Sequence, residues 1–404
     1  MAKQKKWIKA RHRVVCTVVR VLLYPYLKIK YRVNIEKFRA VKDEPYLILY
    51  NHQTPDDQFM LGSACPVPLY YVATEDIFSM GWISGIISWA VAPIPFKKSG
   101  HDMRAIKSCM RVAKEGGSIA LAPEGNRTYS GETCYIKPSI VKFIRALQLP
   151  VAFFLFEGGY GKQPRWSNVT RSGDMKLSVR RVVSVEEYSA MSDDELYELV
   201  VTNMYHDDSE YPAINYHPRT AEYLERLIYV CPECGLSEFR SDKDRFKCLG
   251  CGLEVKYTED KNFVREGDVF TFNNVRDWYR YQNDRINRLD MEQYRGILMY
   301  EDTADIYEVI PYEKKKLLMA GAKAAIYGDK ITLETGVGEI TEMPMESIAS
   351  MACCGRNKLN IYADRTYQLK GSVRFNPVKY MNLMHRYKNQ NGLGGTEDAE
   401  FLGL

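Results

Sequence analysis

Five continuous apolar runs in the first half of the chain limit the folds that it can adopt. They lie at residues 45–50, 69–74, 90–96, 118–123 and 151–156. Helical patterns occur between them at residues 56–64, 101–115 and 137–148. Apolar runs without an alternating polar face are typical of parallel strands that are buried on both faces of a sheet. We therefore predict an α/β domain with a mostly parallel sheet, whose ligand site lies beyond the carboxyl ends of the strands.

Length and charge set further limits. The chain has 404 residues, of which 46% are hydrophobic and 26% charged, so it can form two or three units with cores of their own. This composition excludes a fibrous or disordered protein. The formal net charge of +5 is small, so we expect a partner to be selected by where the charges gather rather than by their sum.

The charges gather at the start of the chain. Residues 1–13 are rich in Lys and Arg and contain no acid, and residues 14–29 are apolar apart from Arg20 and Lys28. Arg20 argues against a spanning helix, and the cleavage site of a signal peptide is missing. We predict that residues 1–30 form a basic amphipathic helix in the interface of an anionic membrane, on its cytoplasmic face. The alternative is a first helix that packs on the core of its own domain.

A second stretch, residues 77–96, carries no charge at all. Its glycines, prolines and small residues favour a buried helix, a turn and then a strand over a transmembrane helix. We therefore predict a protein that binds the membrane peripherally.

Four of the ten cysteines have the spacing of a metal site. They follow the pattern C-x2-C-x13-C-x2-C and are Cys231, Cys234, Cys248 and Cys251. Two C-x2-C turns of this kind supply the four thiolates that tetrahedral zinc requires. Two disulfides or four free thiols are the alternatives, and the missing export signal argues against disulfides. Because four protein ligands leave no position for water, we predict a structural Zn²⁺ in a zinc ribbon over 229–258, and no catalytic cofactor.

The chain changes character after the ribbon. Residues 259–388 combine a polar helix over 274–289 and a last helix over 378–389 with β-like segments around 306–312, 323–334 and 338–371. We predict a helical linker and a small β-rich domain, loosely similar to a pleckstrin-homology barrel, and a disordered tail over 389–404. The ribbon lacks a dense basic and aromatic stripe, so we expect no nucleic acid among the partners.

His52 follows the apolar run at 45–50 and should emerge at the carboxyl end of that strand. A carboxylate from Asp57 that holds one imidazole nitrogen would leave the other nitrogen to take a proton from a hydroxyl. The alternative is structural, because Thr54 and Pro55 resemble the first positions of a helix and Thr-x-x-Asp resembles a capping box. This stretch alone leaves both interpretations open.

Two further strand ends carry charged side chains. Glu124, Gly125 and Arg127 follow the fourth apolar run, and Lys97 and Lys98 follow the third. Guanidinium groups suit phosphate oxygens, and a glycine allows backbone N–H groups to approach an anion. A base beside such groups suits acyl transfer to the hydroxyl of a phosphate-bearing acceptor. For the lysines, solvated surface charges are the alternative.

Four sequence blocks stand in a fixed order. They are N-H-Q-T-P-D-D at 51–57, A-P-I-P-F-K-K-S-G at 92–100, A-P-E-G-N-R-T at 122–128 and L-P-V at 149–151. This order resembles the glycerolipid acyltransferases related to bacterial 1-acylglycerol-3-phosphate acyltransferase. The second block departs from the family, which commonly has G-x-I-F-I-D-R there. The resemblance extends over about residues 10–225, and we assign an acyltransferase domain to 31–228.

The resemblance implies transfer of a fatty acyl group from acyl-CoA or acyl carrier protein to a lysophospholipid, foremost 1-acylglycerol-3-phosphate, giving phosphatidate. It implies that His52 is the general base and that Asp57, rather than Asp56, orients it. It also implies a phosphate site made by Glu124, Gly125 and Arg127, assisted by Lys97, Lys98 and Lys137.

An adaptor protein is the alternative to an enzyme. The acyltransferase fold would then retain lipid-phosphate binding, while the zinc ribbon and the C-terminal domain dock partners. The pair of His52 and Asp57 favours the enzyme, because a binding protein has no reason to keep a base beside its acid. Outside the four blocks, we expect His206, His217 and His385 to be surface or helix-end residues.

Overall fold

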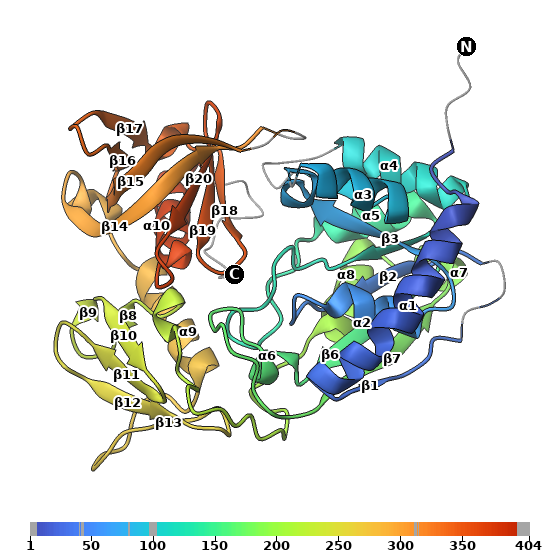
Figure 1. The fold of residues 1–404 in the computed structure, drawn as a ribbon, viewed down its shortest axis with the longest axis horizontal. Helices are drawn as coiled ribbons and strands as arrows, with labels where there is room; N and C mark the ends of the chain where they lie inside the picture. Colours follow the sequence, from blue (N-terminus) through green and yellow to red (C-terminus); the bar gives the residue numbers. More distant parts are fainter. Residues whose placement is uncertain are drawn as a thin grey trace. The chain divides into compact units, whose positions relative to one another are not determined.

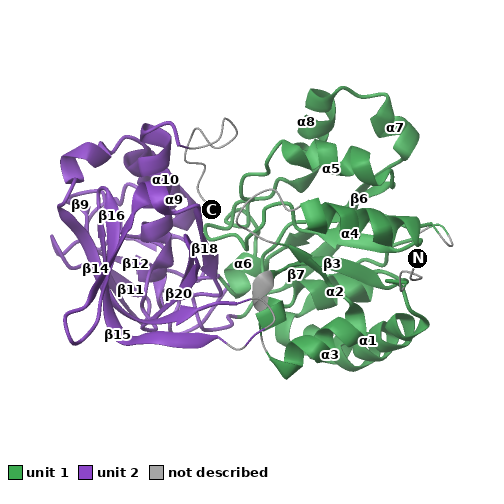
Figure 2. Ribbon diagram, turned by 90° about the horizontal axis from the view of Figure 1, so that it is seen from above, with its two compact units in different colours: residues 1–164, 172–213 green, residues 165–171, 214–404 purple. Residues whose placement is uncertain are grey.

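The structure, a computed structural model, describes residues 6–39, 41, 44–79, 81–96, 103–310, 313 and 315–393, without the side chains of residues 75 and 76. The chain forms two compact units (Figure 2). Unit 1 comprises Met1–Pro164 and Ser172–Ala213, and unit 2 comprises Arg165–Arg171 and Ile214–Leu404. Most of the predicted tail, residues 394–404, lies outside the described residues.

Unit 1 is built on a seven-stranded sheet in the order β1-β7-β6-β2-β5-β3-β4 (Figure 1). The strands are β1 (Val33–Ile35), β2 (Leu47–Tyr50), β3 (Leu69–Thr74), β4 (Ile94–Phe96), β5 (Ser118–Leu121), β6 (Val151–Glu157) and β7 (Met175–Val183). Each neighbouring pair runs parallel except β6 and β7. The predicted mostly parallel sheet is therefore confirmed.

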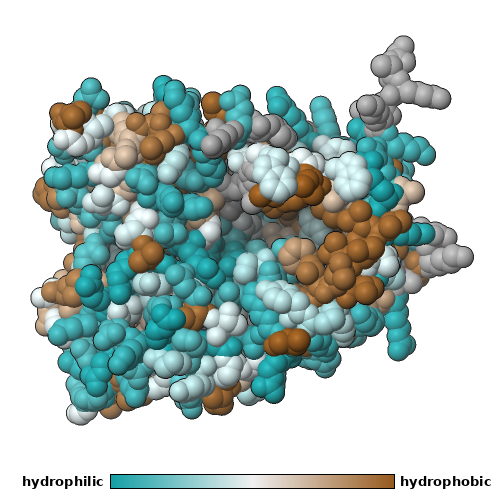
Figure 3. Space-filling view, viewed as in Figure 1, coloured by the Kyte–Doolittle hydropathy of each residue, from teal (hydrophilic) through white to brown (hydrophobic). Residues whose placement is uncertain are grey.

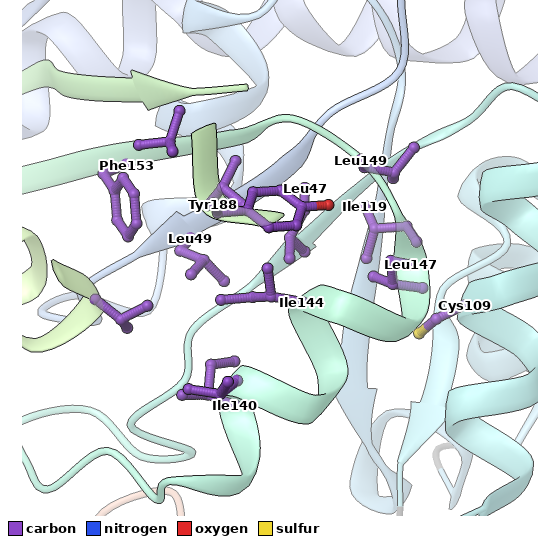
Figure 4. Close-up of a cluster of buried hydrophobic side chains, with 14 of the residues drawn as sticks. Leu47, Leu49, Cys109, Ile119, Ile140, Ile144, Leu147, Leu149, Phe153 and Tyr188 are labelled. Carbon is purple, nitrogen blue, oxygen red and sulfur yellow. The ribbon is translucent and has the colours of Figure 1, made fainter. Parts of the chain in front are cut away.

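Helices cover both faces of this sheet. One face carries α4 (Met103–Lys114), α5 (Ser139–Leu147), α7 (Val185–Ser189) and α8 (Asp193–Met204), and the other carries α1 (Ala10–Tyr31) and α2 (Asp57–Ala64). Along β2, Leu47 and Leu49 pack under α5, as Figure 4 shows, whereas Ile48 and Tyr50 pack under α1 and α2. Burial on both faces explains why this strand is apolar at every position.

The outer surface of α1 and α3 (Trp82–Val91) is apolar. On α1, solvent-exposed residues recur at helical spacing and are Val14, Val18, Val21, Leu22 and Ile29. On α3, Trp82 is 76% exposed and Trp89 is 57% exposed. Together these residues are named the apolar face; the brown area over α1 and α3 in Figure 3 belongs to it.

The prediction that residues 77–96 contain a buried helix is wrong. Within α3 only Ser84 is buried, because the helix lies at the edge of the sheet beside α1 rather than under a second layer. Among the helices of the described residues, none combines the length and the apolar character needed to cross a bilayer.

The ribbon belongs to unit 2. It contains β8 (Val230–Cys231), β9 (Gly235–Leu236), β10 (Phe239–Asp242), β11 (Arg245–Cys248), β12 (Glu254–Tyr257) and β13 (Phe263–Val264). The ribbon packs on α9 (Val275–Asn287), where Trp278 contacts the stacked rings of Phe239 and Phe246 and donates a 2.8 Å hydrogen bond to the Val230 carbonyl.

The rest of unit 2 is a seven-stranded antiparallel sheet in the order β17-β16-β15-β14-β20-β19-β18. Its strands are β14 (Leu298–Glu308), β15 (Lys316–Tyr327), β16 (Lys330–Glu334), β17 (Ile340–Pro344), β18 (Ser350–Cys354), β19 (Lys358–Tyr362) and β20 (Thr366–Gly371), and α10 (Pro377–Gln390) follows. The predicted β-rich region is confirmed, and its likeness to a pleckstrin-homology barrel stays a prediction.

Two boundaries in this domain differ from the prediction. The first strand begins at Leu298 instead of residue 306, because Glu301 and Asp305 alternate with the buried Tyr300 and Ala304. The last helix extends to Gln390, inside the segment predicted as tail. Short 3-10 helices complete the chain at Glu75–Ser79, Leu224–Arg226, Met291–Tyr294 and Met345–Ser347.

Candidate active site and candidate metal site

The loop after β2 is fixed to the sheet by Asn51. Its buried side-chain amide donates to the Phe156 carbonyl over 2.8 Å and accepts from the Phe156 N–H over 2.6 Å. This pair of bonds replaces a strand pairing at the end of β6. As a result, His52 projects from a fixed backbone at the carboxyl end of the sheet, where parallel α/β folds bind their ligands.

The carboxylate of Asp57 contacts the imidazole ring of His52. The distance between His52 Nδ1 and Asp57 Oδ2 is 2.8 Å, and Asp57 has no exposed surface whereas the His52 side chain is 26% exposed. The same carboxylate accepts hydrogen bonds from the N–H groups of Gln53 and Thr54 over 2.7 and 2.9 Å and from the Thr54 hydroxyl over 2.5 Å. These donors fix the position of the buried carboxylate against the imidazole ring.

The two interpretations of this stretch are therefore not exclusive. Asp57 contacts His52 and also accepts the Thr54 N–H, which is one half of a capping box; the other half is not formed, because the Thr54 hydroxyl donates to Asp57 Oδ1. The predicted helix start is wrong, however, because α2 begins at Asp57 with Asp56 as N-cap rather than at Pro55 with Thr54 as N-cap. Residues 54–56 form a turn instead, which brings the carboxylate back over the loop.

Asp56 faces away from His52 and towards α1. Its carboxylate accepts hydrogen bonds of 2.8 Å from Lys30 and from the Tyr31 hydroxyl. The two adjacent aspartates are thus separated in position: Asp57 contacts the histidine, and Asp56 connects α2 to the end of α1.

Glu124 holds the backbone of His52 rather than projecting into open space. Its carboxylate accepts the His52 N–H over 2.9 Å and the Cys134 N–H over 2.7 Å, and Thr128 donates its N–H to the His52 carbonyl over 3.0 Å. Burial raises the pKa of Glu124 to about 7, although the N–H groups of Cys134 and His52 favour its charged form. The loop after β5 therefore fixes the loop after β2.

Gly125 and Arg127 lie in the same loop. Gly125 adopts a φ of +68°, which favours glycine, and its N–H closes a turn onto the Ala122 carbonyl over 3.1 Å. Arg127 donates from Nε to the Gln53 carbonyl and from Nη2 to the Gln163 carbonyl, each over 3.2 Å. The guanidinium is thus held beside the His52 loop.

Of the three predicted lysines, the structure describes only Lys137. Lys97 and Lys98 lie outside the described residues. Lys137 is exposed and precedes α5 by two residues.

His206 is a helix-end residue, as predicted, because it follows the C-cap of α8, but it does not lie on the surface. Its side chain is 12% exposed, and Nε2 lies 3.0 Å from Oδ1 of Asp208, which has no exposed surface. The one weak signal in the sequence is a histidine two residues before an aspartate, and long-range contacts decide that this aspartate is buried.

The four cysteines of the ribbon come together as predicted. Their sulfur atoms all lie within 4.8 Å of one another, and the pairs Cys231–Cys251 and Cys234–Cys248 are 3.6 Å apart. Four sulfurs placed ~2.3 Å from one zinc ion are separated by about 3.8 Å, so this set fits the metal.

Comparison with known proteins agrees with the geometry. Residues 30–153 match the family model described as Acyltransferase. The chain carries an acyltransferase domain. No curated protein matches the chain. The crystal structure of the 1-acyl-sn-glycerophosphate (LPA) acyltransferase PlsC from Thermotoga maritima is similar, with 17% sequence identity and a TM-score of 0.41, covering 48% of this chain and 78% of that chain.

The matched part of the acyltransferase domain contains His52, Asp57, Glu124 and Arg127. It ends before His206 and Asp208, although both belong to unit 1. Asn51 holds the His52 loop through the Phe156 backbone, and sequence reasoning assigned it no role. Thr54, predicted to be a helix cap, instead donates its hydroxyl to Asp57.

Proposed function

We propose that unit 1 transfers a fatty acyl group from the thioester of acyl-CoA or acyl carrier protein to the free hydroxyl of a lysophospholipid, with 1-acylglycerol-3-phosphate as the acceptor and phosphatidate as the product. The observation that carries this proposal is the 2.8 Å contact between His52 and the buried Asp57 in an acyltransferase domain.

In this proposal His52 is the general base. Asp57 engages Nδ1, so the acceptor hydroxyl meets Nε2 and gives its proton there while its oxygen attacks the thioester carbonyl. The tetrahedral intermediate then collapses, the C–S bond breaks, and the imidazolium returns the proton to the leaving thiolate. Asp57 stabilises the imidazolium between these two steps, and no covalent acyl-enzyme forms.

The contacts of the loop after β5 indicate different roles for two residues of the predicted phosphate site, Glu124 and Arg127. Glu124 uses both oxygens on backbone N–H groups, so it serves as a positioning residue for His52. Arg127 is a cation whose Nε and Nη2 bind two backbone carbonyls beside the same loop, and its positive charge suits the acceptor phosphate. Gly125 gives the loop the left-handed turn between them. Lys97, Lys98 and Lys137 would add point charges around the phosphate.

The apolar face supports a membrane as the source of the acceptor. It exposes Leu22 by 69% and Ile29 by 81% on α1, together with Trp82 on α3, and α1 is preceded by a basic segment. Such a surface suits the boundary between head groups and acyl chains of an anionic bilayer. We propose a peripheral position on the cytoplasmic face of the membrane.

The ribbon is proposed to hold a structural Zn²⁺ on its four cysteines.

The test is transfer of labelled palmitoyl from CoA and from acyl carrier protein to 1-acylglycerol-3-phosphate on anionic vesicles. We expect product from the wild type, none above background from His52→Ala, and a loss of about 10⁴-fold in kcat from Asp57→Asn, as when a carboxylate that orients a catalytic histidine is lost. Asp56→Asn is the matched control and should keep its activity, because Asp56 contacts Lys30 and Tyr31 instead. Equal activity of the wild type and His52→Ala would exclude His52 as the base.

A further inference from the structure

Asp208 is a buried acid in unit 1 to which the proposed chemistry gives no role. Its Oδ1 accepts hydrogen bonds from the Gly158 N–H over 2.6 Å, the His206 ring over 3.0 Å and the Gln53 side-chain amide over 3.1 Å. Its Oδ2 accepts the Gly161 N–H over 2.9 Å. Burial opposes the charge, but the bonds from His206, Gly161 and Gly158 hold the pKa of Asp208 below its ordinary value.

These bonds connect three separate segments of the chain. Gly158 and Gly161 belong to the turn around α6 (Gly159–Lys162), which follows β6 at the carboxyl end of the sheet. His206 and Asp208 follow α8. Gln53 directly follows His52 and also accepts the Gly159 N–H over 2.8 Å through its side-chain oxygen. A single carboxylate thus connects the α6 turn and the segment after α8 to the catalytic loop.

Gln53 is the residue through which this network reaches the site. Its N–H binds Asp57, its carbonyl accepts from Arg127, and its side chain, which is 1% exposed, spans Gly159 and Asp208. A shift of Gln53 would therefore move His52 against Asp57. There is little space for such a shift, because a Cβ on Gly159 would lie 2.6 Å from the Gln53 side-chain oxygen.

We infer that Asp208, oriented by His206, is a positioning residue for the catalytic pair, which it holds in register through the side chain of Gln53. This inference rests on the proposed function. It also assigns a part in the site to a segment that lies beyond the residues matching the family model. The sequence separation argues against a merely local role, because Asp208 bonds to Gln53, 155 positions away in the sequence, as well as to His206 in its own turn.

The first test does not require activity. The proton that bridges His52 Nδ1 and Asp57 is observable as a downfield proton NMR resonance, assigned by its loss in His52→Ala. In Asp208→Asn, the NH2 group of the new side chain replaces one of the two acceptor oxygens, so at least one of the groups that donate to Asp208 loses its acceptor. We therefore expect the resonance of the His52–Asp57 proton to shift or broaden. Asp207→Asn is the matched control, because Asp207 accepts hydrogen bonds from Ser209 in the same turn. In this variant the resonance of the His52–Asp57 proton should match that of the wild type.

The second test separates positioning from binding. We expect Asp208→Asn to lower kcat about tenfold or more with KM for 1-acylglycerol-3-phosphate changed less than twofold, since small misplacement of a catalytic group costs rate rather than affinity. If the wild type transfers no acyl group, the proposed function fails, yet the NMR test still decides the positioning. A folded Asp208→Asn protein with wild-type resonance and kcat would overturn the inference.

A second variant covers the case in which Asp208→Asn does not fold. Gln53→Met removes the same connection from the other side with little change in shape, and it leaves Asp208 its bonds from Gly158, Gly161 and His206. We expect the same change of resonance and the same fall in kcat. A wild-type resonance and kcat in Gln53→Met would refute the connection between Asp208 and His52.

Discussion

Replacing Glu124 by Gln should change the pH dependence of stability in a direction that the geometry fixes. The pKa of Glu124 rises from its ordinary value of 4.5 to about 7 in the folded protein. Between these values the folded chain keeps a proton that the unfolded chain has lost. The stabilising contribution of this proton is therefore complete below pH 4.5 and is lost as the pH rises through 7.

The size of the effect follows from the same two pKa values. Their separation corresponds to about 3 kcal/mol, of which about 2 to 3 kcal/mol is lost between pH 5 and pH 8. Glutamine does not ionise, but it has one acceptor oxygen for the N–H groups of His52 and Cys134, so one of them loses its partner at a cost of about 1 to 3 kcal/mol. Glu124→Gln should thus be clearly less stable than the wild type near pH 5 and close to it near pH 8.

Urea unfolding of the full-length proteins at the two pH values measures this difference. Glu198→Gln, at an exposed position on α8, is the control and should leave the pH dependence unchanged. Because the His52 loop loses a contact, kcat of Glu124→Gln should also fall at both pH values. Stability curves of the wild type and Glu124→Gln that run parallel from pH 5 to pH 8 would refute a buried Glu124 that binds the two N–H groups.

Three further predictions concern the phosphate site, the metal and the membrane. Arg127→Lys should raise KM for 1-acylglycerol-3-phosphate and also lower kcat, because lysine cannot hold the Gln53 and Gln163 carbonyls together as the guanidinium does, and an unchanged KM would remove Arg127 from the phosphate site. Elemental analysis should give about one zinc per chain, and Cys248→Ser should lose most of it; a metal-free wild type with a folded ribbon would exclude the site. Trp82→Ser should weaken sedimentation with anionic vesicles about tenfold, whereas Val269→Ser, which is 90% exposed in unit 2, should not; equal losses would move the membrane contact elsewhere.

Some features of this protein were determined by sequence alone because their signals are local. The uniform apolar character of residues such as Leu47 to Tyr50 predicts strands buried on both faces, and the structure has that sheet. The spacing of the four ribbon cysteines predicts a cluster, since two short turns and a hairpin suffice to bring them together. The position of His52 after a strand likewise places it at the carboxyl end of the sheet.

Other features depend on which surfaces meet, and only the tertiary structure decided them. The run at 77–96 is as apolar as a buried helix, yet α3 is exposed because no further layer covers it in the described part of unit 1. Glu124 looked like a phosphate ligand, but the loop after β5 folds onto the loop after β2 and its carboxylate meets backbone N–H groups. Asp208 is buried beside Gln53, 155 positions away, and contacts at such a separation leave no periodicity or spacing in the sequence.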